Sequence, residues 1–154
     1  MFSHKHRIIS RSPPTLESIQ IIENNFDAEN ASRDILTLAD RVPFVGLDCE
    51  WVGTNQAALL QIAVFDSEFP KCYLFRLSKF DKSPMPILSS LLNSRKITKL
   101  GVGIDGDFQR LISEGFSNTE NDSYIDLRFL AAETSTCIPG GLASLVTSLK
   151  YFAA

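Results

Sequence analysis

The chain has 154 residues, of which 44% are hydrophobic and 21% charged, with a net charge of −3 at neutral pH. This length fits one domain with its own core, and the slight acidity excludes a basic field that attracts nucleic acid without specificity. The three widely spaced cysteines exclude a disulfide framework and favour an intracellular, reducing compartment, whether nucleus, cytoplasm or mitochondrion. Both histidines lie within the first six residues, which excludes histidine catalysis in the folded part.

The first 16 residues are basic, contain Pro13-Pro14 and have no acid. This composition predicts a disordered leader or a weak mitochondrial targeting segment, because two prolines limit an amphipathic helix. The folded domain is expected over residues 17–150, with residues 151–154 as a tail. No apolar run reaches the length of a membrane-spanning helix.

Strands dominate the first half of the predicted domain. A short strand is expected at 18–22, followed by a helix at 27–39 with Asn25 or Asp27 as its cap. Three longer strands joined by short turns are expected to form an antiparallel meander: 42–50, 56–65 and 72–77.

The second half alternates helices and strands. Helices are expected at 84–92, 105–115, 128–133 and 142–149, and strands at 97–103 and 123–127. A meander followed by strand-helix-strand units predicts an α/β fold, with a mixed sheet and helices on its faces.

The strand at 42–50 ends in two acids, Asp48 and Glu50. Alternate side chains leave the same face of a strand, so these carboxylates point together, whereas Leu47 and Cys49 point the other way. Paired like charges are costly there without a cation, and oxygen ligands suit Mg²⁺ or Mn²⁺. The alternative is a strand that emerges into solvent with two surface acids of no function. An inverting glycosidase could also use such a pair.

Residues 101–107, Gly-Val-Gly-Ile-Asp-Gly-Asp, form a second acidic stretch where a buried strand passes into a helix. Ligand sites in α/β sheets gather at such strand ends, and the glycines allow a tight turn or a ligand close to the backbone. A phosphate-binding loop is not indicated, because no Gly-Lys-Ser or Gly-Lys-Thr follows. The competing interpretation is ordinary helix capping by Asp105 or Asp107.

Taken together, these stretches resemble the 3′–5′ exonuclease domain of the DEDD superfamily, in its Werner-syndrome-exonuclease and RNase D-like branch. The resemblance covers about residues 42–150 and rests on motifs that follow in order at 46–51, 59–63, 101–107, 125–131 and 141–145. It implies a ribonuclease-H-like fold. It also implies hydrolysis of DNA or RNA phosphodiesters from a 3′ end with two bound Mg²⁺ or Mn²⁺ ions.

The resemblance assigns the metal ligands. Asp48 would bridge both ions, and Glu50 would hold one ion and orient the attacking water. Asp107 would complete the site from the first turn of its helix. The register of the motif favours Asp107 over Asp105.

Substrate contacts are expected from Trp51, Cys49 and Gly103. Trp51 would stack on a terminal base, since such stacking tolerates any base, or else it would be a wedge in the core. Gln61 is expected to be a structural amide. Asp126 is expected to cap a helix or to support the site without binding metal.

One motif of this branch has no counterpart here. It is a Tyr or His followed four positions later by an Asp, the fourth metal ligand. In this sequence no acid follows Glu133, and only three residues follow Tyr151. The expectation is a domain that is incomplete at its C-terminus and impaired in hydrolysis. The alternative is a non-catalytic, truncated form that acts as a nucleic-acid or protein interaction module, of unknown oligomeric state.

Overall fold

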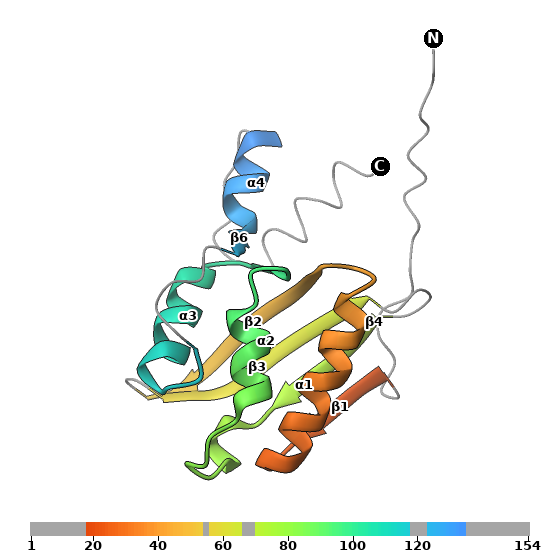
Figure 1. Cartoon of the computed structure of the whole chain (residues 1–154). Helices are drawn as coiled ribbons and strands as arrows, with labels where there is room; N and C mark the ends of the chain where they lie inside the picture. The colour runs from red at the N-terminus through yellow and green to blue at the C-terminus, as the bar shows by residue number, and fades with distance from the viewer. Residues whose placement is uncertain (1–17, 54–55, 66–69, 118–122, 135–154) are drawn as a thin grey trace.

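The computed structural model of the chain describes residues 18–53, 56–65, 70–117 and 123–134 (Figure 1). The expected leader, the helix at 142–149 and the tail lie outside these residues. The strands are β1 (Ile19–Ile22), β2 (Phe44–Val52), β3 (Gln56–Phe65), β4 (Pro70–Phe75), β5 (Thr98–Gly101) and β6 (Tyr124–Asp126). The helices are α1 (Asn25–Ala39), α2 (Pro86–Asn93), α3 (Ile104–Ser113) and α4 (Leu127–Thr134), with a short 3-10 helix, η2 (Leu77–Lys79).

The described strands form one mixed sheet in the spatial order β1-β4-β3-β2-β5-β6. β2, β3 and β4 pair antiparallel, which confirms the predicted meander. β1 pairs parallel with β4, β5 with β2, and β6 with β5, and the chain forms at least one helix between the two strands of each pair. The predicted α/β fold with a mixed sheet is therefore confirmed.

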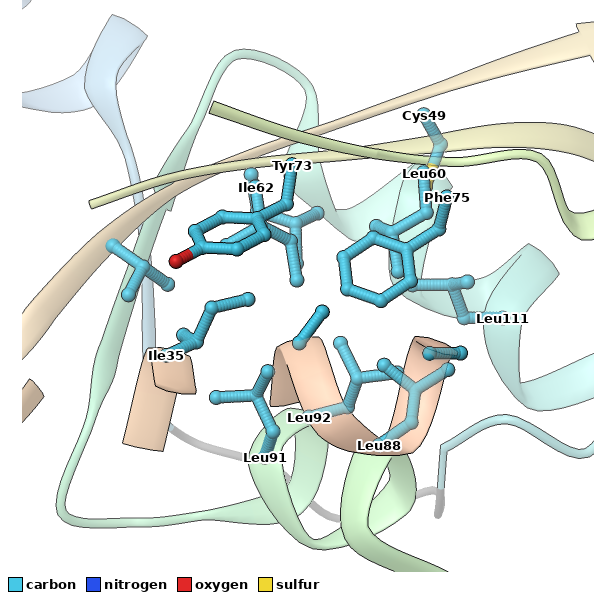
Figure 2. Close-up of a cluster of buried hydrophobic side chains, with 14 of the residues drawn as sticks. Ile35, Cys49, Leu60, Ile62, Tyr73, Phe75, Leu88, Leu91, Leu92 and Leu111 are labelled. Carbon is cyan, nitrogen blue, oxygen red and sulfur yellow. The ribbon is translucent and has the colours of Figure 1, made fainter. Parts of the chain in front are cut away.

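The helices α1, α2 and α3 gather on one face of the sheet, whereas α4 extends beyond β6 (Figure 1). The core lies between that face and these three helices (Figure 2). Fully buried aliphatic and aromatic side chains fill it, among them Ile35, Leu60, Ile62, Tyr73, Phe75, Leu88, Leu91, Leu92 and Leu111. Within the described residues, no helix is long and apolar enough to cross a membrane.

The cap of α1 differs from the prediction. The side chain of Asn24 accepts a hydrogen bond of 2.9 Å from the backbone N–H of Asp27, so Asn24 is the N-cap, and neither Asn25 nor Asp27 is. Asn25 instead binds Asp81 in the loop before α2, with Nδ2 donating to Oδ1 at 2.8 Å. Glu29 accepts the first free N–H groups of α2. The sequence pattern placed the polar cluster correctly, but the tertiary contacts decide which residue caps.

Candidate active site

The acids of β2 face away from the core. Val45, Leu47 and Cys49 are buried against the helices, and the alternation of a strand turns Asp48 and Glu50 to the opposite face. β2 does not end at these acids as predicted: it pairs with β3 as far as Val52, with a register shift after Glu50. The acid pair therefore lies within the sheet, not on a loop that has left it.

Asp48 has a partner on the neighbouring strand. Gln61 lies directly opposite on β3, and its Nε2 donates to Oδ2 of Asp48 at 3.3 Å. This confirms Gln61 as a structural amide. Burial, together with the charge of Glu50, raises the pKa of Asp48 above its ordinary value.

Asp107 is the buried acid of the group. It lies in the first turn of α3 with 3% of its surface exposed, and its Oδ2 makes no hydrogen bond within the described part of the chain. Burial and the nearby charge of Asp48 raise its pKa to about 7, with smaller contributions from Glu50 and Asp126. Most buried carboxylate oxygens accept a hydrogen bond, so an oxygen without a donor is a candidate for binding a ligand.

The three acids are close enough for their charges to interact, which is what the motif predicted. Their side chains do not surround a common point: among the described residues, no three His, Cys, Asp or Glu side chains converge closely enough to hold a metal ion. The donor chemistry nevertheless suits a hard cation, because it offers carboxylate oxygens and no histidine or thiolate. Their mutual repulsion would favour a bound cation beside them, and so would the Oδ2 of Asp107, which has no hydrogen-bond partner among the described residues.

The turn between β5 and α3 explains both glycines. Gly103 has φ +72° and is the N-cap of α3 without a side-chain bond, so neither Asp105 nor Asp107 caps this helix. A Cβ at Gly101 would lie 2.6 Å from the backbone oxygen of Leu47. The close approach there is that of β2 to β5, not that of a ligand.

Asp126 fixes this turn from β6. It is 5% exposed, and its Oδ2 accepts the N–H of Gly103 at 3.0 Å. Its Oδ1 accepts the N–H of Arg128 at 2.9 Å, which caps α4, and the guanidinium of Arg128 donates to both oxygens. These hydrogen bonds from Arg128 hold the pKa of Asp126 below its ordinary value. The predicted role of Asp126 as a cap and support is confirmed.

Asp105 and Asp107 occupy different environments. Asp105 is exposed, and its carboxylate accepts a hydrogen bond from the hydroxyl of Tyr124. The ring of Tyr124 stacks on Phe108, with the ring centroids 5.1 Å apart. Asp107 is the acid that lies with Asp48 and Glu50, in agreement with the register of the motif.

The three predicted substrate contacts fare differently. Trp51 is 41% exposed, so it is not a wedge in the core. Cys49 is 4% exposed and points into the core (Figure 2), so its side chain is not open to a ligand in this structure. The N–H of Gly103 is already bonded to Asp126. Of the three, Trp51 alone keeps a side chain open to a ligand.

Sequence reasoning missed Arg110. This residue lies one turn after Asp107 on α3, and its Cζ is 3.6 Å from the centroid of the Trp51 ring. Its charge also lowers the pKa of Asp107, although burial and the other acids outweigh it. The spacing of three residues from Asp107 was the available signal, since it puts both side chains on neighbouring positions of one helix face.

A family model described as 3′–5′ exonuclease matches residues 19–153, most of the chain. The chain belongs to the 3′–5′ exonuclease family. This confirms the DEDD-type exonuclease domain that the sequence motifs indicated.

The exonuclease domain is similar to the bifunctional 3′–5′ exonuclease/ATP-dependent helicase WRN of Mus musculus. The two are 30% identical over 139 residues, which are 84% of this chain and 10% of that protein. A 3′–5′ exonuclease of Drosophila virilis is 36% identical over 80 residues, which are 49% of this chain and 23% of that protein. The chain thus spans a quarter or less of the length of these relatives.

Solved structures of the EXD2 exonuclease domain share the fold. The structure soaked in Mn and GMP has a TM-score of 0.64 and 27% identity, and the match covers 81% of this chain and 64% of that chain. The structure soaked in Mg has a TM-score of 0.64 and 28% identity, covering 75% and 59%. These matches confirm the ribonuclease-H-like fold.

Proposed function

We propose that this chain carries the metal-binding core of a 3′–5′ exonuclease that hydrolyses nucleic-acid phosphodiesters, with Asp48, Glu50 and Asp107 as its metal ligands. The observation that carries the proposal is the buried Oδ2 of Asp107, which has no hydrogen-bond partner within the described residues and lies beside two further acids. A buried aspartate with a purely structural role is usually hydrogen-bonded through both oxygens or paired with a cation.

Divalent ions, Mg²⁺ or Mn²⁺, would activate water and stabilise the leaving oxygen of the phosphodiester when bound here, two ions being the family expectation. The EXD2 domain was soaked with the same two metals, which supports this choice. Other residues of the chain hold the proposed ligands in position. Gln61 holds one oxygen of Asp48, and Asp126 holds the turn from which Asp107 projects.

Trp51 is the proposed contact for the terminal base, through the ring face opposite the one on which Arg110 stacks. It follows Glu50 directly in the chain and is partly open to solvent. Base stacking on an aromatic side chain contributes about 1–3 kcal/mol per base and tolerates any sequence. This suits an enzyme that shortens strands without reading them.

The test is digestion of a 3′-labelled and a 5′-labelled single-stranded oligonucleotide, as DNA and as RNA, with Mg²⁺ or Mn²⁺. The proposal expects slow, stepwise shortening from the 3′ end that stops with chelator and in Asp48→Ala. Asp105→Asn is the matched control and should shorten the strand at the wild-type rate. Shortening that persists in Asp48→Ala, or internal cleavage, would count against it.

A second candidate is a non-catalytic module that binds nucleic acid or protein. One observation favours it: among the described residues, no three potential ligands converge closely enough to hold a metal ion. This candidate expects the 154-residue chain to bind a 3′ end without shortening it at any metal concentration. The same digestion assay, run beside a binding measurement, separates the two.

A further inference from the structure

Arg110 is held in place by an aromatic ring. Its Cζ lies 3.6 Å from the centroid of the Trp51 ring, a distance that gives a cation–π contact. Trp51 comes from β2, directly after Glu50, and Arg110 comes from α3, one turn after Asp107. The stacked pair therefore connects the two elements that supply the acids.

The donors of Arg110 are available. Within the described part of the chain, its guanidinium makes no ion pair and no hydrogen bond, although Asp107 lies on the same helix and Glu114 directly follows it. Two other arginines differ: Arg128 donates to both oxygens of Asp126, and Arg76 pairs with Glu23. A fixed guanidinium with unused N–H groups is prepared to receive an anion.

A phosphodiester is the anion that fits. Asp107 lies close enough to Arg110, Asp48 and Glu50 for their charges to act on it, and the chain as a whole carries a net charge of −3, so an anionic strand needs a local cation here. Guanidinium matches phosphate with two parallel hydrogen bonds, and stacking on Trp51 removes much of the motion that such a contact would otherwise have to restrain.

We infer that Arg110 binds a backbone phosphate of single-stranded nucleic acid at its 3′ end, with Trp51 as the platform that orients the guanidinium. This inference rests on the proposed function for the identity of the strand. It adds a positioning contact outside the acidic centre, which acts on substrate affinity and not on the chemical step.

The experiment uses Trp51 as its reporter, since it is the single tryptophan of the chain. An oligothymidylate 10-mer with a free 3′ hydroxyl is titrated into the 154-residue protein in chelator, and Trp51 fluorescence is followed at several salt concentrations. Arg110→Gln should weaken binding about tenfold, because glutamine loses the positive charge and the charge-assisted hydrogen bonds to the phosphate. The slope of log K against log salt should shrink by about 0.7, the loss of one phosphate contact on a single strand.

Two further variants make the outcome decisive. Arg110→Lys should recover the salt slope but only part of the affinity, because lysine keeps the positive charge but cannot donate two parallel hydrogen bonds to the phosphate. Arg33→Gln on α1, an exposed arginine that donates to Asn30, should bind as the wild type does. Wild-type affinity and slope in Arg110→Gln overturn the inference, and so does the absence of any binding by the wild type.

The readout also separates this inference from the proposed function. Binding in chelator needs no turnover, so a chain that binds through Arg110 but never shortens the strand overturns only the exonuclease proposal. A chain that shortens the strand with the same KM in wild type and Arg110→Gln overturns only the role of Arg110.

Discussion

Two buried aspartates, Asp107 and Asp126, lie close together but differ in their hydrogen bonds and in the direction of their pKa shifts. Both are at most 5% exposed. Asp126 accepts hydrogen bonds from two backbone N–H groups and from Arg128, and its pKa is lowered. Asp107 has an oxygen without a donor in the described residues, acidic neighbours and a pKa raised to about 7. Asp126 therefore stabilises the turn and the start of a helix, whereas Asp107 is the acid that we propose as a metal ligand.

The contrast separates an acid with a structural role from one that is proposed to bind a ligand. The two carboxylates are about equally buried, so burial does not distinguish them. Their hydrogen-bond partners and the neighbouring charges do. The satisfied Asp126 holds Gly103, and Gly103 begins the helix that presents the unsatisfied Asp107. The hydrogen-bonded carboxylate of Asp126 therefore supports the turn that positions the unpartnered carboxylate of Asp107.

Removing the satisfied acid should have the largest effect on the fold. Asp126→Ala leaves the N–H groups of Gly103 and Arg128 without their acceptor, so we expect a loss of about 2–4 kcal/mol in the free energy of unfolding. Urea unfolding measures it. Asp126→Asn keeps an acceptor oxygen and should lose about half as much. Equal, small effects in both variants would contradict the role of Asp126.

Removing the carboxylate of Asp107 should instead stabilise the metal-free fold at alkaline pH. Folding raises the pKa of Asp107 from 3.8 to about 7, so between these pH values the folded chain binds a proton that the unfolded chain does not. Metal-free stability should therefore fall as pH rises from about 4 to about 7. Asp107→Asn should remove this slope and gain about 1–3 kcal/mol at pH 8, with no gain at pH 4. Urea unfolding at both pH values tests this, and a destabilised Asp107→Asn at pH 8 would contradict it.

Lys99 extends the comparison to a buried cation, with a smaller expected effect. It is 1% exposed in β5, its Nζ donates to the backbone oxygen of Ser94 and to Oγ of Ser123, and burial lowers its pKa to about 8. The unfolded chain binds the extra proton between pH 8 and 10.5, so stability should rise with pH there. Lys99→Met should gain about 1–2 kcal/mol at pH 7. Thermal unfolding should show the gain shrinking by pH 9.5; a pH-independent difference would contradict this origin.

The sequence predicted most of the sheet because alternation and turn residues act locally. The meander of β2, β3 and β4 follows from apolar runs and short connections, and the structure confirms it. The cap of α1 was wrong by one residue, because Asn25 is engaged by Asp81, which is 56 residues further along the chain. Such a contact has no local signal.

The site was only partly predictable for the same reason. The pairing of Asp48 with Glu50 follows from the period of a strand, but the choice of Asp107 over Asp105 needed the family motif. Local physics allows both acids to cap a helix, and only the left-handed Gly103, held by Asp126, excludes this. The stacking of Arg110 on Trp51 joins two distant segments, and no single stretch contains it.

The central claim is that Asp107, together with Asp48 and Glu50, binds a divalent cation. Its most direct test is the change in thermal unfolding temperature on adding Mn²⁺ at pH 7.5, compared among wild type, Asp107→Asn and the neighbouring control Asp105→Asn. Because a ligand stabilises only the state that binds it, Mn²⁺ should raise the unfolding temperature of wild type and Asp105→Asn and leave that of Asp107→Asn unchanged. An equal rise in all three proteins, or no rise in the wild type, would contradict the claim.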